Sequence, residues 1–277
     1  MKVTVITPCY NPGPFLKPML ESVGRNAEFV ARHIVMDGGS TDGSVEVLRE
    51  WSKGRPWFSF ESEKDGGQSD ACRKALEKVE TEYFFWLNAD DVMCDGAIAV
   101  LTGAIGEGDH PAIVYGDYLR IDGEGRVYAR RRQPSFNAWD CLHGYITVQN
   151  AAAIFNAPML RAAGGFDPSL RFVMDYDIVL KLGTTSTVRH VRQYCGAFRT
   201  HEGSKTMTID GVCRDETRRL RIKYGVSANP VVSWAQNVAA KTRVVIRMAM
   251  QGCLGVRLEG VLHHAQGFLM HLTEDFR

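Results

Sequence analysis

The chain has 277 residues, of which 45% are hydrophobic and 23% charged, and its formal net charge is +1. This composition excludes a disordered chain and supplies a sizeable core, in one large domain or in a domain with an appendage. The near-neutral charge and the lack of interleaved aromatic and basic residues argue against a nucleic-acid partner, so we expect a small substrate. Seven cysteines, none spaced as Cys-x-x-Cys, are typical of reduced packing residues and argue against a zinc site or a disulfide framework.

The N-terminal residues lead directly into an apolar strand pattern, without a targeting segment before it. No window of about 18 residues is free of charge, so a membrane-spanning helix is not expected. We therefore expect a protein of the cytoplasm.

Strand and helix patterns alternate over about the first hundred residues. The expected strands are 3–7, 33–36, 57–61 and 83–87, and the expected helices between them are 13–24, 44–51 and 68–79. Parallel neighbours need a crossover connection, so this order predicts an α/β fold with a mostly parallel sheet and helices on both faces.

The second half of the chain has a different pattern. Residues 112–117 and 126–128 flank the turn sequence at 122–125, which predicts a β-hairpin. The remaining expected elements are helices at 136–142, 157–163 and 176–182 and strands at 152–155 and 187–191.

Polar residues follow three of the predicted strands, at ends that parallel strands bring to one edge of the sheet, where open α/β sheets bind ligands. Tyr10 can stack on a nucleotide base, and Asp37 can accept hydrogen bonds from the base. The glycines after Asp37 allow close approach of the backbone. Turn formation and helix capping are the alternative for Asp37 and are favoured for Asp42.

Asp90 and Asp91 follow the aromatic strand 83–87. Adjacent carboxylates repel each other unless a cation compensates, and Mg²⁺ or Mn²⁺ shared with a phosphate-bearing substrate is the usual compensation. An isolated Asp-Asp pair is more often a solvated turn. The surrounding motifs favour the metal site.

Six motifs occur in order between residues 3 and 206, and together they resemble glycosyltransferase family 2. They are Thr-Pro-Cys-Tyr-Asn at 7–11, Asp-Gly-Gly-Ser-Thr-Asp-Gly at 37–43, Gly-Gln-Ser-Asp-Ala at 67–71, Asn-Ala-Asp-Asp at 88–91, Gly-Gly-Phe-Asp at 164–167 and Met-Asp-Tyr-Asp at 174–177. The resemblance implies the GT-A fold, with a Rossmann-like, mostly parallel central sheet. It also implies transfer of a sugar from a nucleotide diphosphate, UDP being favoured, to an acceptor hydroxyl, with inversion at the anomeric carbon and with Mn²⁺ or Mg²⁺ on the diphosphate.

The implied setting is bacterial polysaccharide or glycolipid synthesis, with a glycan or lipid-linked glycan as acceptor. The alternative is a non-catalytic nucleotide-sugar or glycan-binding protein with the same fold. A nicotinamide-dependent dehydrogenase is disfavoured because no Gly-x-Gly-x-x-Gly follows the first strand. The expected organisation is a catalytic domain at 1–216, with a nucleotide-binding half at 1–97 and an acceptor-binding half at 98–216, followed by a basic helical extension at 217–277.

The resemblance assigns the reacting groups. Asp91 is the expected direct metal ligand, and Asp90 is expected to hold the ribose hydroxyls or to reach the metal through water. Asp175 stands where the family places its base, although Met174 replaces the acid that usually precedes it; the alternative for Asp175 is helix capping. His201 is expected to reach the metal or the donor phosphates, a surface or packing role being equally plausible.

Other residues are expected to bind the substrates. The nucleotide set is Thr7, Pro8, Tyr10, Asn11, Asp37, Gly67, Gln68, Asp70, Asn88 and Asp90. The acceptor or phosphate set is Gly165, Phe166, Trp139, Gln149, Ser204 and Lys205. Aromatic packing is the alternative for Trp139, and simple solvation is the alternative for Lys205.

The tail is strongly basic, since Glu259 is the only acidic residue between Thr217 and Leu272. One interpretation is attachment to an anionic membrane that carries a lipid-linked acceptor. The other, which we favour, is packing of amphipathic helices against the catalytic domain or against a second subunit in a homodimer.

Overall fold

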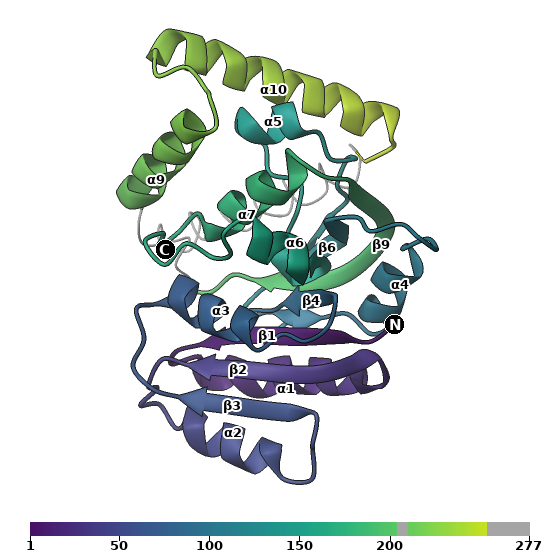
Figure 1. Ribbon diagram of the computed structural model, residues 1–277, viewed down its shortest axis with the longest axis vertical. Helices are drawn as coiled ribbons and strands as arrows, with labels where there is room; N and C mark the ends of the chain where they lie inside the picture. The colour runs from purple at the N-terminus through teal and green to yellow at the C-terminus, as the bar shows by residue number, and fades with distance from the viewer. Residues whose placement is uncertain (204–209, 254–277) are drawn as a thin grey trace, which may run out of the picture.

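The computed structural model describes residues 1–203 and 210–253 (Figure 1). Ser204 and Lys205, both predicted to contact phosphate, lie outside the described residues. A nine-stranded sheet crosses the molecule in the order β3-β2-β1-β4-β8-β6-β9-β5, with β7 paired to β6. The strands are β1 Val3–Cys9, β2 Val30–Asp37, β3 Phe58–Ser62, β4 Tyr83–Trp86, β5 Val92–Met93, β6 Ile113–Ile121, β7 Val127–Arg131, β8 Ala153–Asn156 and β9 Val188–Arg199.

Helices cover both faces of the sheet, as the alternating pattern predicts. They are α1 Leu16–Arg25, α2 Ser44–Ser52, α3 Gln68–Glu77, α4 Ala97–Gly103, α5 Ala138–Leu142, α6 Ala157–Ala162, α7 Met174–Gly183, α9 Asp210–Lys223 and α10 Pro230–Met250. One core cluster joins the sheet to α3, α6 and α7, and the other joins it to α1, α2 and α4. Every residue of β1 is buried, because the strand lies between these two clusters.

The first four strands along the chain, β1 to β4, are parallel to one another, as predicted. In the register, Cys9 of β1 pairs with Asp37 of β2, and Asp37 pairs with Ser62 of β3. The carboxyl ends of these strands therefore meet at one edge. The loops that follow them form the nucleotide side of the candidate site.

The predicted hairpin is confirmed as β6 and β7, but β9 is longer than the expected strand at 187–191. It continues to Arg199 because it pairs along most of β6 and then with β5. Arg192 and Gln193 interrupt its apolar pattern, which hides this length in the sequence. At Gly196 an added Cβ would lie 1.6 Å from the carbonyl oxygen of Ala151, so only glycine lets β9 pass this close to the neighbouring turn.

The described part of the C-terminal extension consists of α9 and α10. The predicted domain boundary after residue 216 falls within α9, whose Leu220 is buried in the core. α10 packs against α5, at the end of the molecule opposite α2 (Figure 1). Packing, which was the favoured interpretation of the tail, is confirmed for this part. Within the described ranges, we find no helix with the length and apolar character needed to cross a bilayer.

Candidate functional site

The loops after β1 and β2 are joined by hydrogen bonds. Asn11 has φ +46°, a conformation that residues other than glycine rarely adopt. Its backbone N–H donates to the Ser40 hydroxyl at 2.8 Å, and its side-chain oxygen accepts from the Thr41 N–H at 2.8 Å. Tyr10, next to this turn, is 68% exposed. The turn therefore presents an aromatic ring to solvent from a fixed backbone, and the stacking of this ring on a base stays a prediction.

Asp37 is held by donors from two strand ends. Its Oδ2 accepts from the backbone N–H groups of Gly39 and Ser40 and from the Ser62 hydroxyl at 2.6 Å, while its Oδ1 accepts from the Ser40 hydroxyl. Burial acts to raise the pKa of Asp37, but these hydrogen bonds outweigh it and lower the pKa. Asp37 is thus an ionised, fixed acceptor.

A chain of amide and carboxylate groups links α3 to the Asp-Asp motif. Gln68, at the start of α3, donates from Nε2 to the Asn88 side-chain oxygen at 2.8 Å, and Asn88 donates from Nδ2 to Asp91 Oδ2 at 3.1 Å. The structure thus brings Gln68 together with two residues that lie 20 or more positions later in the sequence. Asn88 therefore orients both of its hydrogen-bond partners, the Gln68 amide and the Asp91 carboxylate.

Asp91 is buried, with 1% of its surface exposed. Its Oδ1 accepts from the backbone N–H of Arg199 at 2.9 Å. Burial, and next the charge of Asp90, raise the pKa of Asp91 well above its usual range. A buried carboxylate next to a second one has an energetic need for a positive charge.

His201 follows β9 and lies beside this motif. Its Nε2 is 3.2 Å from Asp90 Oδ2, and its ring is 4.4 Å from that of Phe15. The long β9 accounts for this, because it carries the chain back to Asp90 and Asp91. All three predicted metal-binding residues therefore lie in one cluster.

The donors of this cluster suit a divalent cation. Carboxylate oxygens and a neutral imidazole nitrogen are ligands that Mn²⁺ accepts well, and a cation would offset the repulsion between Asp90 and Asp91. Among residues 1–203 and 210–253, no three His, Cys, Asp or Glu side chains are already gathered as a ligand set. The residues fit the ion in the kind of ligand atom that they offer, and binding would require their side chains to turn toward it.

Asp175 lies in the first turn of α7 and lines a cavity of about 110 Å³. Gln149, predicted to contact the acceptor, lines the same cavity together with Tyr118, Ile146, Thr147 and Val148. Burial raises the pKa of Asp175, and within the described residues no basic side chain pairs with it. A carboxylate in this situation is a stronger base than a solvated one.

The segment that carries Asp175 contacts α3. Ser69, the residue after Gln68, donates to the Leu170 carbonyl, and its hydroxyl lies 3.2 Å from the Met174 sulfur. Met174 is buried, so the residue that replaces the expected acid fills a space in the core. Asp175 is consequently the residue next to one that contacts the helix carrying Gln68.

Glu216 holds the segment before α7 and was not anticipated from the sequence. This buried carboxylate of α9 accepts from the backbone N–H groups of Arg171 and Phe172 at 2.9 Å and of Val173 at 3.3 Å. It satisfies donors that lead into the first turn of α7. α9 thereby fixes the backbone immediately before Asp175, and no local motif signals this contact across more than 40 residues.

Some predicted nucleotide-binding side chains have structural contacts instead. The Thr7 side chain is buried and lies 3.0 Å from His33 Nε2, and Pro8 is also buried in β1. Asp70 accepts from Arg73 and from the Gly66 N–H, and the hydrogen bond from Arg73 lowers its pKa. Gly67 has φ +107° and begins α3, where only a glycine adopts this backbone easily.

Three of the predicted acceptor residues, Phe166, Gly165 and Trp139, also lie in structural positions. Phe166 is buried, with its ring 5.2 Å from that of Trp86, and Gly165 ends α6 in a left-handed conformation. Trp139 stacks on His143 at 4.2 Å and beneath the Arg243 guanidinium of α10. In the described part of the chain, none of the three lines the cavity beside Asp175.

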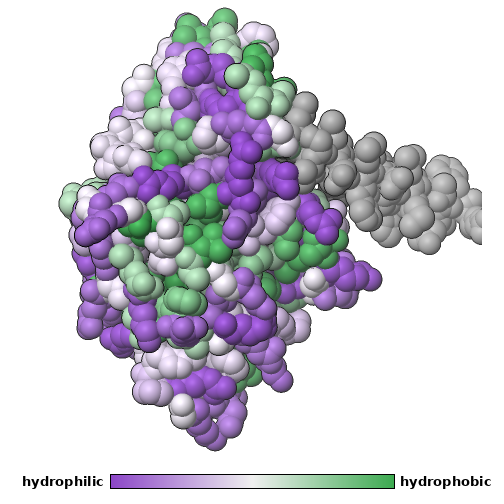
Figure 2. Space-filling view, turned by 90° about the vertical axis from the view of Figure 1, so that its right-hand side faces the viewer, coloured by the Kyte–Doolittle hydropathy of each residue, from purple (hydrophilic) through white to green (hydrophobic). Residues whose placement is uncertain are grey.

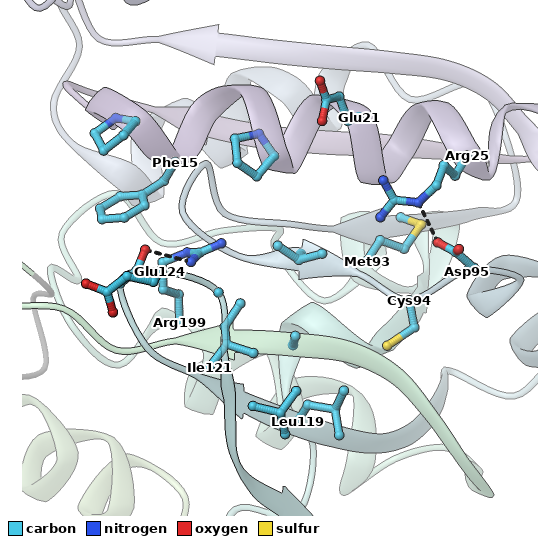
Figure 3. A pocket seen from close by; sticks show the side chains of 17 residues that line it. Phe15, Glu21, Arg25, Met93, Cys94, Asp95, Leu119, Ile121, Glu124 and Arg199 are labelled. Atoms are coloured by element: carbon cyan, nitrogen blue, oxygen red, sulfur yellow. Dashed lines mark hydrogen bonds and ion pairs between the residues drawn. The ribbon is translucent and has the colours of Figure 1, made fainter.

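A second cavity, of about 600 Å³, lies between α1, β5 and the β6–β7 turn (Figure 3). Phe15 and Arg199 stand at one end, and the Arg25–Asp95 ion pair, at 2.7 Å, stands at the other. Burial lowers the pKa of Arg199, whose guanidinium donates to the carbonyls of residues 122 and 123. No sequence motif indicated this cavity. Two of its lining residues contact the predicted metal ligands: Phe15 packs against His201, and Arg199 donates hydrogen bonds to Asp90 and Asp91.

The chain is similar to parts of two curated polymerising enzymes. It is 25% identical over 202 residues to the chondroitin synthase of Escherichia coli, covering 70% of this chain and 28% of that protein. It is 26% identical over 186 residues to the teichoic acid poly(glycerol phosphate) polymerase of Staphylococcus epidermidis, covering 65% of this chain and 26% of that protein. The chain thus spans about a quarter of the length of these relatives.

Two solved structures have a similar fold. TarS 1–349 of S. aureus in complex with UDP-GlcNAc matches with a TM-score of 0.66 and 16% identity, covering 90% of this chain and 72% of that one. The mannosyltransferase PcManGT of Pyrobaculum calidifontis, in complex with GDP-Man and Mn²⁺, matches with a TM-score of 0.56 and 13% identity, covering 96% and 87%. The predicted GT-A fold is confirmed. The model of glycosyl transferase family 2 matches residues 4–161, which is more than half of the chain, and the chain therefore belongs to this family.

Proposed function

We propose that the chain is an inverting, metal-dependent glycosyltransferase. It transfers a sugar from a UDP-sugar to a hydroxyl of a glycan or lipid-linked glycan, in the synthesis of a bacterial polysaccharide or glycolipid. The observation that carries the proposal is Asp175, a carboxylate with a raised pKa and no basic partner among the described residues. It lines a cavity and directly follows Met174, which contacts the helix that carries Gln68. The relatives support the general class, since the names of two of them describe polymer synthesis.

The hydrogen bonds of Asp37 favour uracil as the base. Its Oδ2 already accepts three hydrogen bonds and its Oδ1 accepts one, and the Cys9 side chain is a further hydrogen-bond partner of this carboxylate. With so many protein donors engaged, Asp37 accommodates one further donor more easily than two. The uracil edge has one imide N–H to donate, whereas the guanine edge has an N–H beside an amino group and needs two acceptors. The UDP-GlcNAc complex of TarS agrees with this choice, and the GDP-Man complex of PcManGT makes GDP-sugars the comparison to test.

The residues Asp91, Asp90 and His201 would hold the cation. When bound there, a divalent ion supplies Lewis-acid stabilisation of the charge that develops on the leaving nucleoside diphosphate. Asn88 and Gln68 keep the Asp91 carboxylate oriented through their hydrogen bonds. Tyr10 stacks on the base, and Asp37 accepts its imide proton in a hydrogen bond.

Asp175 acts on the acceptor. Its carboxylate takes the proton of the acceptor hydroxyl as the oxygen attacks the anomeric carbon, and its raised pKa makes it the better base for this step. Gln149 and Thr147 line the same cavity and can orient the hydroxyl by hydrogen bonds. Attack from the side opposite the leaving diphosphate inverts the anomeric carbon.

The test is a panel of UDP-, GDP- and dTDP-sugars, assayed for nucleotide release with Mn²⁺, with Mg²⁺ and with EDTA. We expect release from a UDP-sugar, lost with EDTA and restored by Mn²⁺. Release from GDP-sugars alone would contradict the assignment of Asp37. Tight UDP-sugar binding without release in the presence of a broad set of glycan acceptors would instead favour a binding protein.

A further inference from the structure

The buried contacts and ion pairs on one side of α10 fix the orientation of this helix. Ala240, Val244 and Met248, spaced four residues apart, are buried on that side. Arg243 and Arg247 both pair with Asp140 of α5, a carboxylate that is 1% exposed. The side of α10 that turns toward solvent therefore follows from these contacts.

The outer face of α10, turned away from the body, is apolar. It consists of Val231, Trp234, Val238, Val245, Ile246 and Met250, which are 71%, 68%, 43%, 51%, 54% and 83% exposed. A helix on the surface of a soluble domain normally turns its polar residues outward. At the top of Figure 2, where α10 lies, atoms of hydrophobic residues reach the surface beside hydrophilic ones. Six exposed apolar side chains on one face of a single helix are typical of an interaction site.

The segment that carries the outer face has charges of one sign. Residues 217–253 contain seven basic residues and no acidic one. Lys241 borders the outer face and is exposed, and Arg218, Arg219 and Lys223 of α9 are exposed as well. The occupant of this surface must therefore offer both apolar groups and negative charge.

These two requirements distinguish the possible occupants. A second copy of the chain would bring Lys241 toward its own symmetry mate, and the segment 217–253 supplies no carboxylate to pair with it. An anionic bilayer offers hydrocarbon for the valines and phosphate groups for the cations. A tryptophan on such a face suits the boundary between head groups and acyl chains.

We propose that the outer face of α10 lies on the surface of an anionic lipid bilayer, with Trp234 in the interfacial layer and Lys241 at the level of the head groups. The association is peripheral and reversible, because a single helix face is buried to a shallow depth. It involves no residue of the proposed catalytic site. Its test is therefore independent of the glycosyltransferase assignment.

The test is flotation of the full chain with vesicles of phosphatidylcholine alone or of phosphatidylcholine mixed with phosphatidylglycerol. We expect flotation with the mixed vesicles, reduced by high salt and by omission of phosphatidylglycerol. The double variant Val238→Ser, Val245→Ser should bind roughly tenfold more weakly because two apolar side chains are lost from the contact. Lys241→Gln should bind about fivefold more weakly.

The matched control is the double variant Val47→Ser, Val127→Ser, whose valines are 39% and 45% exposed outside α10. It should float like the unmodified chain. Since all these side chains are exposed, thermal melting should be unchanged in both double variants. Tryptophan emission provides a second measurement: a blue shift on addition of mixed vesicles should be lost in Trp234→Phe.

Three results would overturn the proposal. The first is equal flotation of the α10 variant and its control, and the second is no flotation of the unmodified chain at low salt. The third is a dimer in analytical ultracentrifugation, without lipid, that Val238→Ser, Val245→Ser dissociates, since that result would assign the outer face to a second copy.

Discussion

Asp37 and Asp175 are both predicted site carboxylates, and their surroundings shift the pKa in opposite directions. Hydrogen bonds from Ser40 and Ser62 overcome burial and lower the pKa of Asp37, whereas burial raises that of Asp175. On the nucleotide side, the loops satisfy their carboxylate before any ligand arrives. On the acceptor side, no basic side chain of the described residues pairs with Asp175, and its raised pKa makes its carboxylate a stronger base. The difference indicates a recognition group in the first case and a reacting group in the second.

The variant Asp175→Asn should have the largest effect. An amide cannot take the acceptor proton, so we expect kcat to fall by about a thousandfold, within the usual range for loss of a general base. Calorimetric affinity for the donor should not change, because Asp175 lines the acceptor cavity. The exposed Asp215→Asn is the control, and turnover of Asp175→Asn at the level of the unmodified chain would refute the assignment of the base.

The pH dependence of turnover should report the same group. Because only the ionised carboxylate accepts a proton, kcat should fall as the pH falls through a pKa that lies above the ordinary range of an aspartate. The measurement is kcat between pH 4 and 8, roughly the range in which such a shifted carboxyl titrates. A rate that is independent of pH over this range would contradict a raised pKa.

The variant Glu216→Gln tests whether the base is positioned from a distance. One of the two side-chain positions that accept backbone N–H groups becomes an NH₂ donor, so the segment before Asp175 should shift. We expect kcat to fall roughly tenfold to a hundredfold with little change in the KM for the donor. Asp215→Asn, which changes the exposed residue immediately before Glu216 in α9, again serves as control. A change in donor KM with kcat intact would show that Glu216 does not act through Asp175.

The variant Asp37→Asn should have the smallest effect on turnover and a clear effect on stability. Loss of the charged acceptor should lower the free energy of unfolding by about 2 kcal/mol at neutral pH and weaken UDP binding. Because the folded pKa of Asp37 lies below its unfolded value, its stabilisation is present above the unfolded pKa and is lost as the pH falls through the folded pKa. Urea unfolding at neutral and acid pH should show the difference from the unmodified chain shrinking in acid.

The parallel part of the fold and the grouping of Tyr10, Asp37 and Asp91 could be predicted because they depend on local patterns. Alternating strands and helices specify the crossovers, and the crossovers bring the strand ends together. The orientation of Thr7 could not be predicted, since β1 is buried on both faces and its pattern does not distinguish them. A residue in such a strand turns either toward the site or into the core.

Contacts between distant segments account for the rest. The Glu216 carboxylate meets residues 171–173 only because α9 packs on the core, and Gln149 reaches the cavity of Asp175 only through the arrangement of the sheet. Trp139 resembles an acceptor-binding aromatic in sequence, yet it packs beneath Arg243. Gln149 could be named as a candidate from the sequence, but neither its place beside Asp175 nor the contacts of Glu216 and Trp139 follow from a local spacing.

The most direct test of the account is calorimetric titration of UDP with and without Mn²⁺ into the unmodified chain, Asp91→Asn and Asp175→Asn. The account predicts Mn²⁺-dependent binding in the unmodified chain and in Asp175→Asn, and loss of that dependence in Asp91→Asn. Unchanged Mn²⁺-dependent binding of UDP by Asp91→Asn would contradict it.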